Sequence, residues 1–272
     1  MERSPNPLSP SAIFPEPGSH PWSDRLLVLE ETDSTNLLAK AEVRKGAPGG
    51  TVIVADRQTA GRGRLGRTFL SPGDVGVYFS AILRPACPPQ ELMHLTCAAG
   101  VAVSEGICAA CGVEPGIKWT NDLILNGKKL GGILTEMSIR PDGLVDWAIV
   151  GIGINCNQLP ADFPPEIESL ATSLRMALGQ APDKAALAAA LVSTLYQMRL
   201  SLFDGKEEMM AHFTRCCVTI GQSISIVRGS EVHHATATGV DENGGLQVVY
   251  PDGKTDTVTS GEVSIRGMYG YV

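Results

Sequence analysis

Residues 117–154, IKWTNDLILNGKKLGGILTEMSIRPDGLVDWAIVGIGI, carry the clearest signals of the fold class of this chain. Their apolar segments are separated by two tight-turn signals, Asn126-Gly127 and Pro141-Asp142-Gly143. Asparagine and glycine accept the left-handed backbone that a hairpin turn needs, so each signal predicts a reversal of the chain. We therefore expect antiparallel strands at 117–119, 123–125, 133–139 and 144–154.

Outside this stretch the pattern adds strands and helices. Apolar runs rich in β-branched residues predict strands at 25–29, 51–55 and 75–83. One helix is predicted to begin at the polar cluster 32–36, and two more are predicted to cover 90–111 and 182–203. A shorter helix follows and is predicted to end near residue 217. The helix over 182–203 carries one apolar stripe, made of Leu187, Leu191, Leu195, Met198 and Leu202. The predicted fold class is α+β, a mainly antiparallel mixed sheet with helices packed on it.

The two ends of the chain differ from the middle in composition and in the spacing of their apolar residues. Residues 1–24 are rich in proline without apolar periodicity, which predicts a flexible arm and leaves open whether it docks on the body. From Gly221 onward, short strands with glycine-rich turns predict a small β-barrel, with strands at 224–227, 235–240, 246–249 and 263–266. The expected domains are therefore the arm 1–24, a body 25–219 and a C-terminal barrel 220–272.

Composition excludes several classes of protein. The formal net charge of −7 argues against a protein whose main task is to bind nucleic acid, so DNA binding is not expected. No apolar run of 18 residues is present, and we expect no membrane span and a cytoplasmic location. The odd number of cysteines, seven, favours reduced thiols in the core. Cys108-Ala-Ala-Cys111 is alternatively half of a zinc site or a redox pair, although no second CxxC accompanies it.

One segment concentrates positive charge in this acidic protein. Residues 57–67, RQTAGRGRLGR, contain four arginines and three glycines, which predicts a mobile loop that binds an anion. Gly61 to Gly66 match the GxGxxG pattern of dinucleotide sites, but Pro72-Gly73 follows where that motif needs a helix. No GK[ST] sequence of a phosphate loop is present there either. A solvated basic turn remains the alternative.

Two further segments carry polar residues suited to a nucleotide. Lys118-Trp-Thr-Asn-Asp122 is followed by Lys129, and a lysine beside the Gly131-Gly132 pair can approach a phosphate or carboxylate. Asp122 is a candidate magnesium ligand through water, or else an Asx turn before a strand. Gly151-Ile-Gly-Ile-Asn155 suggests that a ligand such as a purine approaches the backbone, with a bulge and turn as the alternative.

These motifs together resemble the biotin protein ligase family. The resemblance rests on five segments in order and spacing, namely 33–36, 58–67, 118–122, 129–134 and 151–155, and extends from about Leu26 to Gly261–Arg266. It implies a catalytic domain like that of class II synthetases with a C-terminal SH3-like barrel. It also implies an enzyme that uses ATP and Mg²⁺ to convert biotin to biotinyl-5′-AMP. The biotinyl group would then pass to a lysine of a biotin carboxyl carrier protein or domain.

The resemblance also implies the roles of individual residues. Lys129, Arg64 and Asp122 would be catalytic, and Asp122 would hold Mg²⁺. Phe69 stands where many relatives carry Trp, and Leu65 where one branch has Arg. The biotin- and ATP-binding residues would be Ser34, Thr35, Asn36, Gln58, Gly61, Arg62, Gly63, Arg64, Arg67, Phe69, Lys118, Trp119, Asn121, Lys129, Gly132, Gly151 and Asn155, with Asn155 near the adenine.

Three other functions are alternatives to that of a biotin protein ligase. A lipoate ligase of the same superfamily usually carries an Arg-Arg and Gly-Gly-Gly loop, where this chain has GRGRLGR. A non-catalytic module would bind biotin without releasing pyrophosphate from ATP. A repressor needs an N-terminal helix-turn-helix domain, which the 24 residues before Arg25 are too proline-rich to form. Both a monomer and a homodimer remain open.

Overall fold

The hairpins predicted from the two turn signals form the centre of the larger sheet. In the computed structural model, which describes residues 8–259 and 264–267, β5 (Asp122–Leu125) turns into β6 (Lys128–Ile139) through Asn126 and Gly127. Both turn residues have positive φ, 52° and 72°. The second turn, with Gly143 at φ 85°, leads into β7 (Val145–Asn155). The predicted antiparallel core of the fold is therefore confirmed.

The larger sheet has seven strands in the order β1-β2-β3-β7-β6-β5-β4. Its other members are β1 (Leu26–Thr32), β2 (Val52–Gln58), β3 (Gly76–Leu83) and β4 (Gly116–Lys118). Only the β1 and β2 pair is parallel. Parallel neighbours need a crossover, and α2 (Thr35–Arg44) supplies it between these two strands. The sheet is thus mixed but mainly antiparallel, as predicted.

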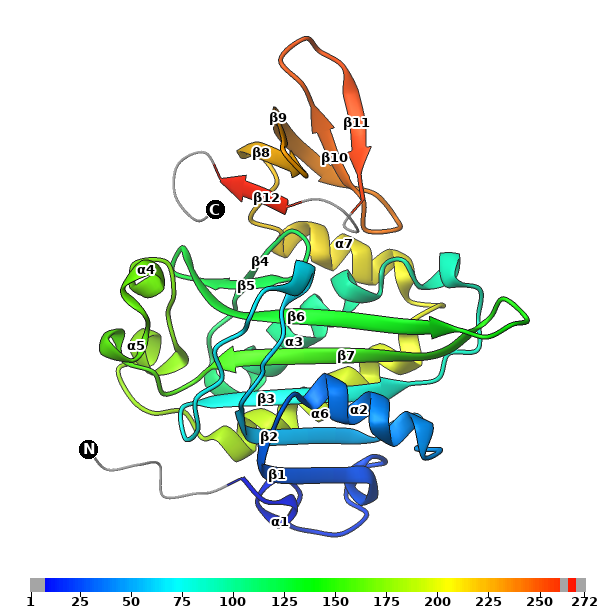
Figure 1. The fold of residues 1–272 in the computed structure, drawn as a ribbon, viewed down its shortest axis with the longest axis vertical. Helices are drawn as coiled ribbons and strands as arrows, with labels where there is room; N and C mark the ends of the chain where they lie inside the picture. Colours follow the sequence, from blue (N-terminus) through cyan, green and yellow to red (C-terminus); the bar gives the residue numbers. More distant parts are fainter. Residues whose placement is uncertain (1–7, 260–263, 268–272) are drawn as a thin grey trace.

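Helices cover the two faces of this sheet unequally (Figure 1). The helices α3 (Leu95–Cys111) and α6 (Lys184–Ser201) pack together on one face, and the predicted stripe of α6 is buried there. The segment Pro89–Cys111 is long and apolar enough to cross a membrane, but 72% of its most apolar window is buried inside the molecule, as in a core helix. On the opposite face α2 covers a small cluster that includes Ile53, Ile82 and Ile149. The part of this face beside α2 is covered by the loop between β2 and β3 (Figure 1).

The other elements are short, apart from α7 and the strands of a second sheet. The short helices are α1 (Pro10–Ile13), η1 (Ser23–Arg25), η2 (Arg64–Gly66), η3 (Pro89–Leu92), η4 (Pro160–Asp162), α4 (Pro165–Glu168) and α5 (Leu174–Leu178). After α7 (Lys206–Cys216), a five-stranded antiparallel sheet follows in the order β11-β10-β9-β8-β12. Its strands are β8 (Ser223–Arg228), β9 (Glu231–Val240), β10 (Leu246–Val249), β11 (Thr255–Val258) and β12 (Ser264–Gly267). Val263, which we predicted to begin the last strand, lies outside the described residues.

The C-terminal sheet packs on α3, α7 and β4 through a shared apolar cluster. Trp119 and Phe213 contribute to this cluster from the body, and Ile226, Leu246 and Val248 from the small sheet. The indole N–H of Trp119 donates to the carbonyl oxygen of Gly244 at 2.8 Å. The two sheets are therefore joined by buried side chains as well as by the chain itself.

The N-terminal arm contacts the body through a few residues. Within residues 8–24, Ile13 and Trp22 are buried against the body, only 3% and 2% exposed, whereas most of the other residues are exposed. The Trp22 ring lies edge-on to Tyr196 of α6, with ring centroids 5.6 Å apart, and His20 also contacts Tyr196. The sequence predicted a flexible or loosely draped arm, and the contacts of Ile13, His20 and Trp22 form without any periodic pattern that could have predicted them. Docking, the possibility left open, is what the structure shows.

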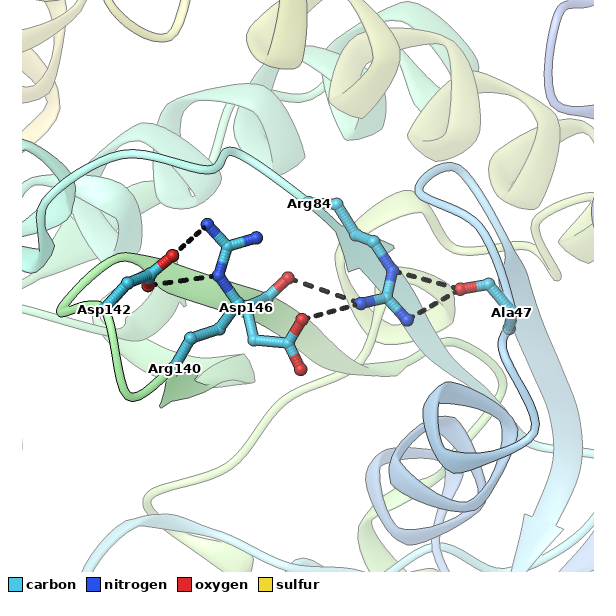
Figure 2. Close-up of polar contacts among 5 residues, drawn as sticks. All are labelled: Ala47, Arg84, Arg140, Asp142 and Asp146. Carbon is cyan, nitrogen blue, oxygen red and sulfur yellow. Dashed lines mark hydrogen bonds and ion pairs between the residues drawn. The ribbon is translucent and has the colours of Figure 1, made fainter.

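Arginine contacts stabilise the end of the larger sheet at which β3 and β6 end and β7 begins (Figure 2). Arg84, just after β3, donates to the carbonyl oxygen of Ala47 and to both the carbonyl and carboxylate oxygens of Asp146. Arg140 pairs with Asp142 in the adjacent turn. These contacts lie at the start of β7, so they hold the end of the sheet opposite Gly151 and Gly153 of β7.

The seven cysteines are all unpaired. Cys87, Cys97, Cys156 and Cys217 are buried, as predicted for core thiols, whereas Cys108 is exposed and Cys111 and Cys216 are half-buried. Burial raises the pKa of Cys97 to about 12. Such thiols are poor nucleophiles at neutral pH.

Candidate active site

A cavity of about 540 Å³ lies on the α2 side of the larger sheet, beside the first turn of α2. The loop between β2 and β3 crosses in front of the sheet (Figure 1). Residues 62–65 and 67–69 of this loop line the cavity on the side opposite the sheet. Most of the predicted binding residues line this cavity, although they come from five separate segments. These are Ser34, Thr35, Asn36, Gln58, Arg62, Gly63, Arg64, Arg67, Phe69, Lys118, Trp119, Asn121, Asp122, Lys129, Gly132 and Gly151.

One end of the cavity is a network of buried neutral polar groups. The Gln58 side-chain oxygen accepts from the backbone N–H of Thr35 at 2.9 Å and from its hydroxyl at 3.2 Å. The hydroxyl of Ser80, which is fully buried, lies 2.8 Å from the Thr35 hydroxyl and 2.6 Å from the side-chain oxygen of Asn36. Because each partner fixes the next, the donors and acceptors of this end are oriented before a ligand arrives.

Two glycines of β7, Gly151 and Gly153, line the cavity where other residues would place a side chain. In β7 the even-numbered side chains, among them Val150 and Ile152, join the core beneath α3 and α6. The alternate positions Gly151 and Gly153 face the other way, and a Cβ atom there would collide with the side chains of Asn36 and Phe69 respectively. The glycines were predicted to let a ligand approach the backbone of β7. The structure shows that the side chains of Asn36 and Phe69 also lie against this backbone.

The glycine-arginine segment folds as a short hairpin over the cavity. Arg62 pairs with Thr68, the N–H of Gly63 donates to the carbonyl oxygen of Arg67 at 2.7 Å, and η2 forms the tip. At this tip Leu65 has a positive φ of 54° and a side chain that is 58% exposed. A dinucleotide-binding helix is absent here, as predicted, and the alternative of a purely solvated turn is wrong because the loop lines a cavity.

Positive charge gathers at the end of the cavity away from the Gln58 network. Arg64 donates to the side-chain oxygen of Asn121 at 2.8 Å, and the Lys129 ammonium lies 2.7 Å from Asp122. Burial lowers the pKa of Arg64, although the nearby charge of Asp122 acts to raise it. Guanidinium groups remain protonated at any physiological pH. The structure therefore confirms that the loop and Lys129 share one hollow, with cations facing it.

Two predicted residues lie outside the lining of this cavity. Gly61 is buried behind it, where a Cβ atom would collide with the Phe69 carbonyl oxygen and the Ser71 hydroxyl. Asn155 lines a neighbouring cavity of about 340 Å³, mostly apolar, which shares Lys129 and Phe69 with the first. The Asn155 amide is engaged, since its nitrogen donates to Thr172 at 3.0 Å and its oxygen accepts from Gln158 at 3.1 Å.

Trp119 reaches the cavity but serves mainly as a structural residue. It is 4% exposed, its backbone N–H donates to the Thr219 hydroxyl at 2.9 Å, and its ring belongs to the joint with the C-terminal sheet. The structure places Trp119 in the lining of the cavity, and its role in binding a ligand stays a prediction.

Sequence reasoning missed Glu136 and Ser80. Glu136 accepts from Asn36 at 3.0 Å and from Lys40 at 2.6 Å, and lies 3.6 Å from Arg62 of the loop. Burial acts to raise the Glu136 pKa, but the hydrogen bonds from Lys40 and Asn36 outweigh it and hold the pKa below its ordinary value. The available signal was strand periodicity, because Glu136 is in phase with Gly132 on β6.

The residues around Asp122 do not form a complete metal cage. Among the residues that the structure describes, the single group of three or more His, Cys, Asp or Glu side chains with converging ligand atoms lies elsewhere. One oxygen of Asp122 already contacts Lys129. A lone carboxylate fits a magnesium ion that keeps waters and is held chiefly by substrate phosphates, which is the usual mode for Mg²⁺.

The chain is similar to known proteins over most of its length. Residues 28–155 match the biotin/lipoate A/B protein ligase family, and residues 219–266 match the biotin protein ligase C terminal domain. A biotin–[acetyl-CoA-carboxylase] ligase of Paracoccus denitrificans is 30% identical over 88% of this chain and 100% of its own length. A solved biotin protein ligase from Aquifex aeolicus, in complex with biotin and ATP, is 32% identical, with a TM-score of 0.76 over 89% of this chain and 99% of that one.

A further relative is longer than the match. The bifunctional ligase/repressor BirA of Bacillus subtilis is 45% identical over 183 residues, which are 67% of this chain and 56% of that protein. The chain therefore spans little more than half of the length of this relative.

Proposed function

The chain belongs to the biotin/lipoate A/B protein ligase family, and from this premise we propose that it is a biotin protein ligase. It would activate biotin with ATP to biotinyl-5′-AMP and transfer the biotinyl group to a lysine of a biotin carboxyl carrier protein or domain. One observation carries the proposal, namely a cavity with buried neutral hydrogen-bonding groups at one end and cationic groups at the other. Biotin has the same polarity, with a neutral ureido ring at one end and a carboxylate at the other.

The neutral end suits a cyclic urea. A ureido group offers one carbonyl acceptor and two N–H donors, and the side chains of Thr35, Gln58 and Asn36 supply both kinds of partner in a buried setting. Ser34, the N-cap of α2 and 2% exposed, lies beside them. A site that is built to hydrogen-bond its substrate discriminates strongly against an analogue without those groups. Lipoate has no ureido ring and would leave these partners unmatched.

The cationic end suits the activation step. An oxygen of the biotin carboxylate attacks the α-phosphorus of ATP, the bond from that phosphorus to the bridging oxygen breaks, and pyrophosphate leaves. Two anions must meet, and Arg64 and Lys129 would offset their repulsion in a site sheltered from water. Asp122 orients the Lys129 ammonium at 2.7 Å, which supports placing Lys129 between the carboxylate and the α-phosphate. Arg62, Arg67, Lys118 and Asn121 would bind the remaining phosphate oxygens.

The neighbouring apolar cavity suits the adenine ring. Phe69, Phe163 and Leu170 line it, and Lys129 stands where the two cavities adjoin. A nucleotide whose base occupies this second cavity would bring its α-phosphate to Lys129, beside the carboxylate in the first. Mg²⁺ would accompany the phosphates, with Asp122 as a water-mediated ligand, and would add charge neutralisation there.

Transfer to the acceptor follows from the same geometry. The product of the first step is a mixed anhydride, which water hydrolyses, so the hairpin of residues 61–69 would shelter it until the acceptor arrives. The neutral amine of the acceptor lysine then attacks the biotinyl carbonyl carbon, an amide forms, and AMP leaves with the anhydride oxygen. Asp122 is our candidate to accept the proton. A normal transfer rate from preformed adenylate in Asp122→Asn would exclude that role.

Intact-mass spectrometry tests the proposal. The full chain is incubated with biotin, ATP, Mg²⁺ and a biotin carboxyl carrier domain, and we expect the domain to gain one biotinyl group only when all components are present. A parallel arm with lipoate and a lipoyl domain should give no product. Modification of the lipoyl domain alone would identify a lipoate ligase instead. Thermal stabilisation by biotin without pyrophosphate release from ATP would identify a non-catalytic binding module.

A further inference from the structure

Three potential metal ligands converge between α3 and α7, away from the cavity. His212 and Cys216 lie one helical turn apart on α7, and Glu114 lies just after α3. The ligand atoms of these three residues all lie within 4.8 Å of one another. Glu105 of α3 lies beside this group, with its carboxylate 3.2 Å from Nδ1 of His212, and is within reach by side-chain rotation. We call these four residues the α3–α7 cluster.

Two distances in the α3–α7 cluster, 3.2 Å and 3.8 Å, are close to those between the ligand atoms of a zinc site. Bonds of about 2.0–2.3 Å at tetrahedral angles place neighbouring ligand atoms about 3.3–3.6 Å apart. Here the Cys216 sulfur lies 3.8 Å from Oε1 of Glu114. Side-chain rotation alone can close such differences, since the Glu105 and His212 side chains are 50% and 26% exposed. The helix backbone sets the His212 and Cys216 pair at i and i+4, which puts both on one face.

From this convergence we propose that the α3–α7 cluster binds one zinc-class divalent cation. The ligands are the thiolate of Cys216, the imidazole of His212 and the carboxylates of Glu114 and Glu105. A sulfur ligand with an imidazole selects zinc over magnesium or calcium, which prefer oxygen alone. Binding requires the Cys216 thiol to lose its proton, and the cation supplies the charge that makes this loss favourable.

The cation would brace the junction between the two sheets. Directly after Cys216, the backbone of Val218 donates to Ile117 of β4 at 3.0 Å, and the Thr219 hydroxyl accepts from Trp119. Trp119 in turn lines the cavity of the proposed active site. Fixing the end of α7 to α3 therefore restrains the segment through which the C-terminal sheet joins the body. The consequence is a zinc-dependent stability of the whole chain.

Cobalt substitution of the metal-free full chain tests the site, because Co²⁺ bound by a thiolate has a near-ultraviolet charge-transfer band. We expect one equivalent of Co²⁺ to produce this band and one equivalent of Zn²⁺ to displace it. Cys216→Ser should abolish the band. His212→Ala should weaken Zn²⁺ binding at least about tenfold, since even outer-shell partners of a metal are worth that much. Circular dichroism and the melting temperature of each apo variant verify that it is folded.

Cys108→Ser is the matched control, because Cys108 is an exposed cysteine of α3 outside the cluster. This variant should keep the band and the Zn²⁺ affinity. Loss of the band in Cys108→Ser with its survival in Cys216→Ser would assign the metal to the Cys108 and Cys111 pair and overturn the proposal. Absence of stoichiometric Zn²⁺ binding by the wild-type chain would also overturn it. These measurements need neither biotin nor ATP.

Discussion

The two sides of the proposed biotin cavity are built in different ways. The floor is formed by strands and the start of α2, and its polar groups, such as Ser80 and Asn36, are buried and mutually hydrogen-bonded. The roof is the loop hairpin of residues 61–69, whose tip is exposed and which contacts the sheet through the Phe69 ring over Gly153 and through long side chains such as Arg64 and Arg62. The floor is rigid because its partners are buried, whereas the roof is held partly by contacts that water can replace.

This difference separates recognition from chemistry. Groups that read a neutral ring need fixed geometry, since an unmatched buried donor or acceptor costs free energy. Groups that bring two anions together act by charge, and a long cationic side chain on a loop can follow the reacting atoms. We therefore expect floor substitutions to weaken biotin binding and substitutions of cationic residues to slow adenylate formation.

Lys129→Ala should have the largest effect. Removing a cation that stabilises developing charge typically costs about 10²–10³ in rate, and we expect that loss in pyrophosphate release with biotin and ATP. Biotin binding without ATP should change much less. Lys128→Ala is the matched control, because Lys128 is the neighbouring lysine of β6 and does not line the cavity. Unchanged pyrophosphate release in Lys129→Ala would remove this residue from the mechanism.

Arg64→Ala should slow the same step by about 10², the low end of the range for such groups. The effect should be smaller than for Lys129 because Arg64 comes from the roof, where Arg62 and Arg67 also face the cavity. Single-turnover measurement of adenylate formation separates this effect from binding. An effect on the biotin dissociation constant alone, with a normal rate at saturation, would contradict the division between floor and roof.

Gly151→Ala and Gly153→Ala form a pair that compares the two sides directly. The new Cβ of Gly151→Ala would meet the amide of Asn36, which is locked into the floor, and should cost about 1–3 kcal/mol, as overpacking does. The new Cβ of Gly153→Ala would meet the ring of Phe69, which the roof can move. We expect a smaller loss of stability and of biotin affinity in Gly153→Ala. Equal losses in denaturant unfolding and calorimetric titration would mean that the roof is as rigid as the floor.

Glu136→Gln should loosen the link between floor and roof. It removes a charge-assisted partner of Lys40 and Arg62, and we expect about a fivefold increase in the KM for biotin, equivalent to about 1 kcal/mol. The folded pKa of Glu136 lies below its ordinary value of 4.5, so its stabilisation is present above that value and is lost as the pH falls below it. The free energy of unfolding, measured in urea, should therefore decline less steeply from pH 6 to pH 3 in the variant than in the wild type. An identical pH dependence in both proteins would contradict the assignment.

Leu65→Gly should have the smallest effect. Leu65 has a left-handed backbone, which costs a non-glycine residue about 1 kcal/mol, but glycine loses a similar amount through the flexibility of the unfolded chain. The net change in the free energy of unfolding should stay within about 0.5 kcal/mol. Gly66→Ala is the contrasting variant, because its φ of 72° strains alanine and should lower the melting temperature. A large activity loss in Leu65→Gly would show that the Leu65 side chain itself binds a substrate or the acceptor.

The sequence alone determined the elements and the segments of the site. Asn126-Gly127 and the stripe of α6 predicted a hairpin and a helix correctly, because turn geometry and amphipathic burial are local properties. Charge density and glycine spacing likewise marked the loop that covers the cavity. These features depend on residues only a few positions apart.

The tertiary structure decided which side chains meet. Asn36 contacts Glu136 across 100 positions, Trp22 packs on Tyr196 of α6, and Trp119 bonds to Gly244 of the second sheet. Asn155 was assigned to a ligand from its motif, yet its amide is bound to Thr172 and Gln158. Such pairings depend on strand register and on how helices dock, which are settled only when the whole core packs, so no local pattern in the sequence could reveal them.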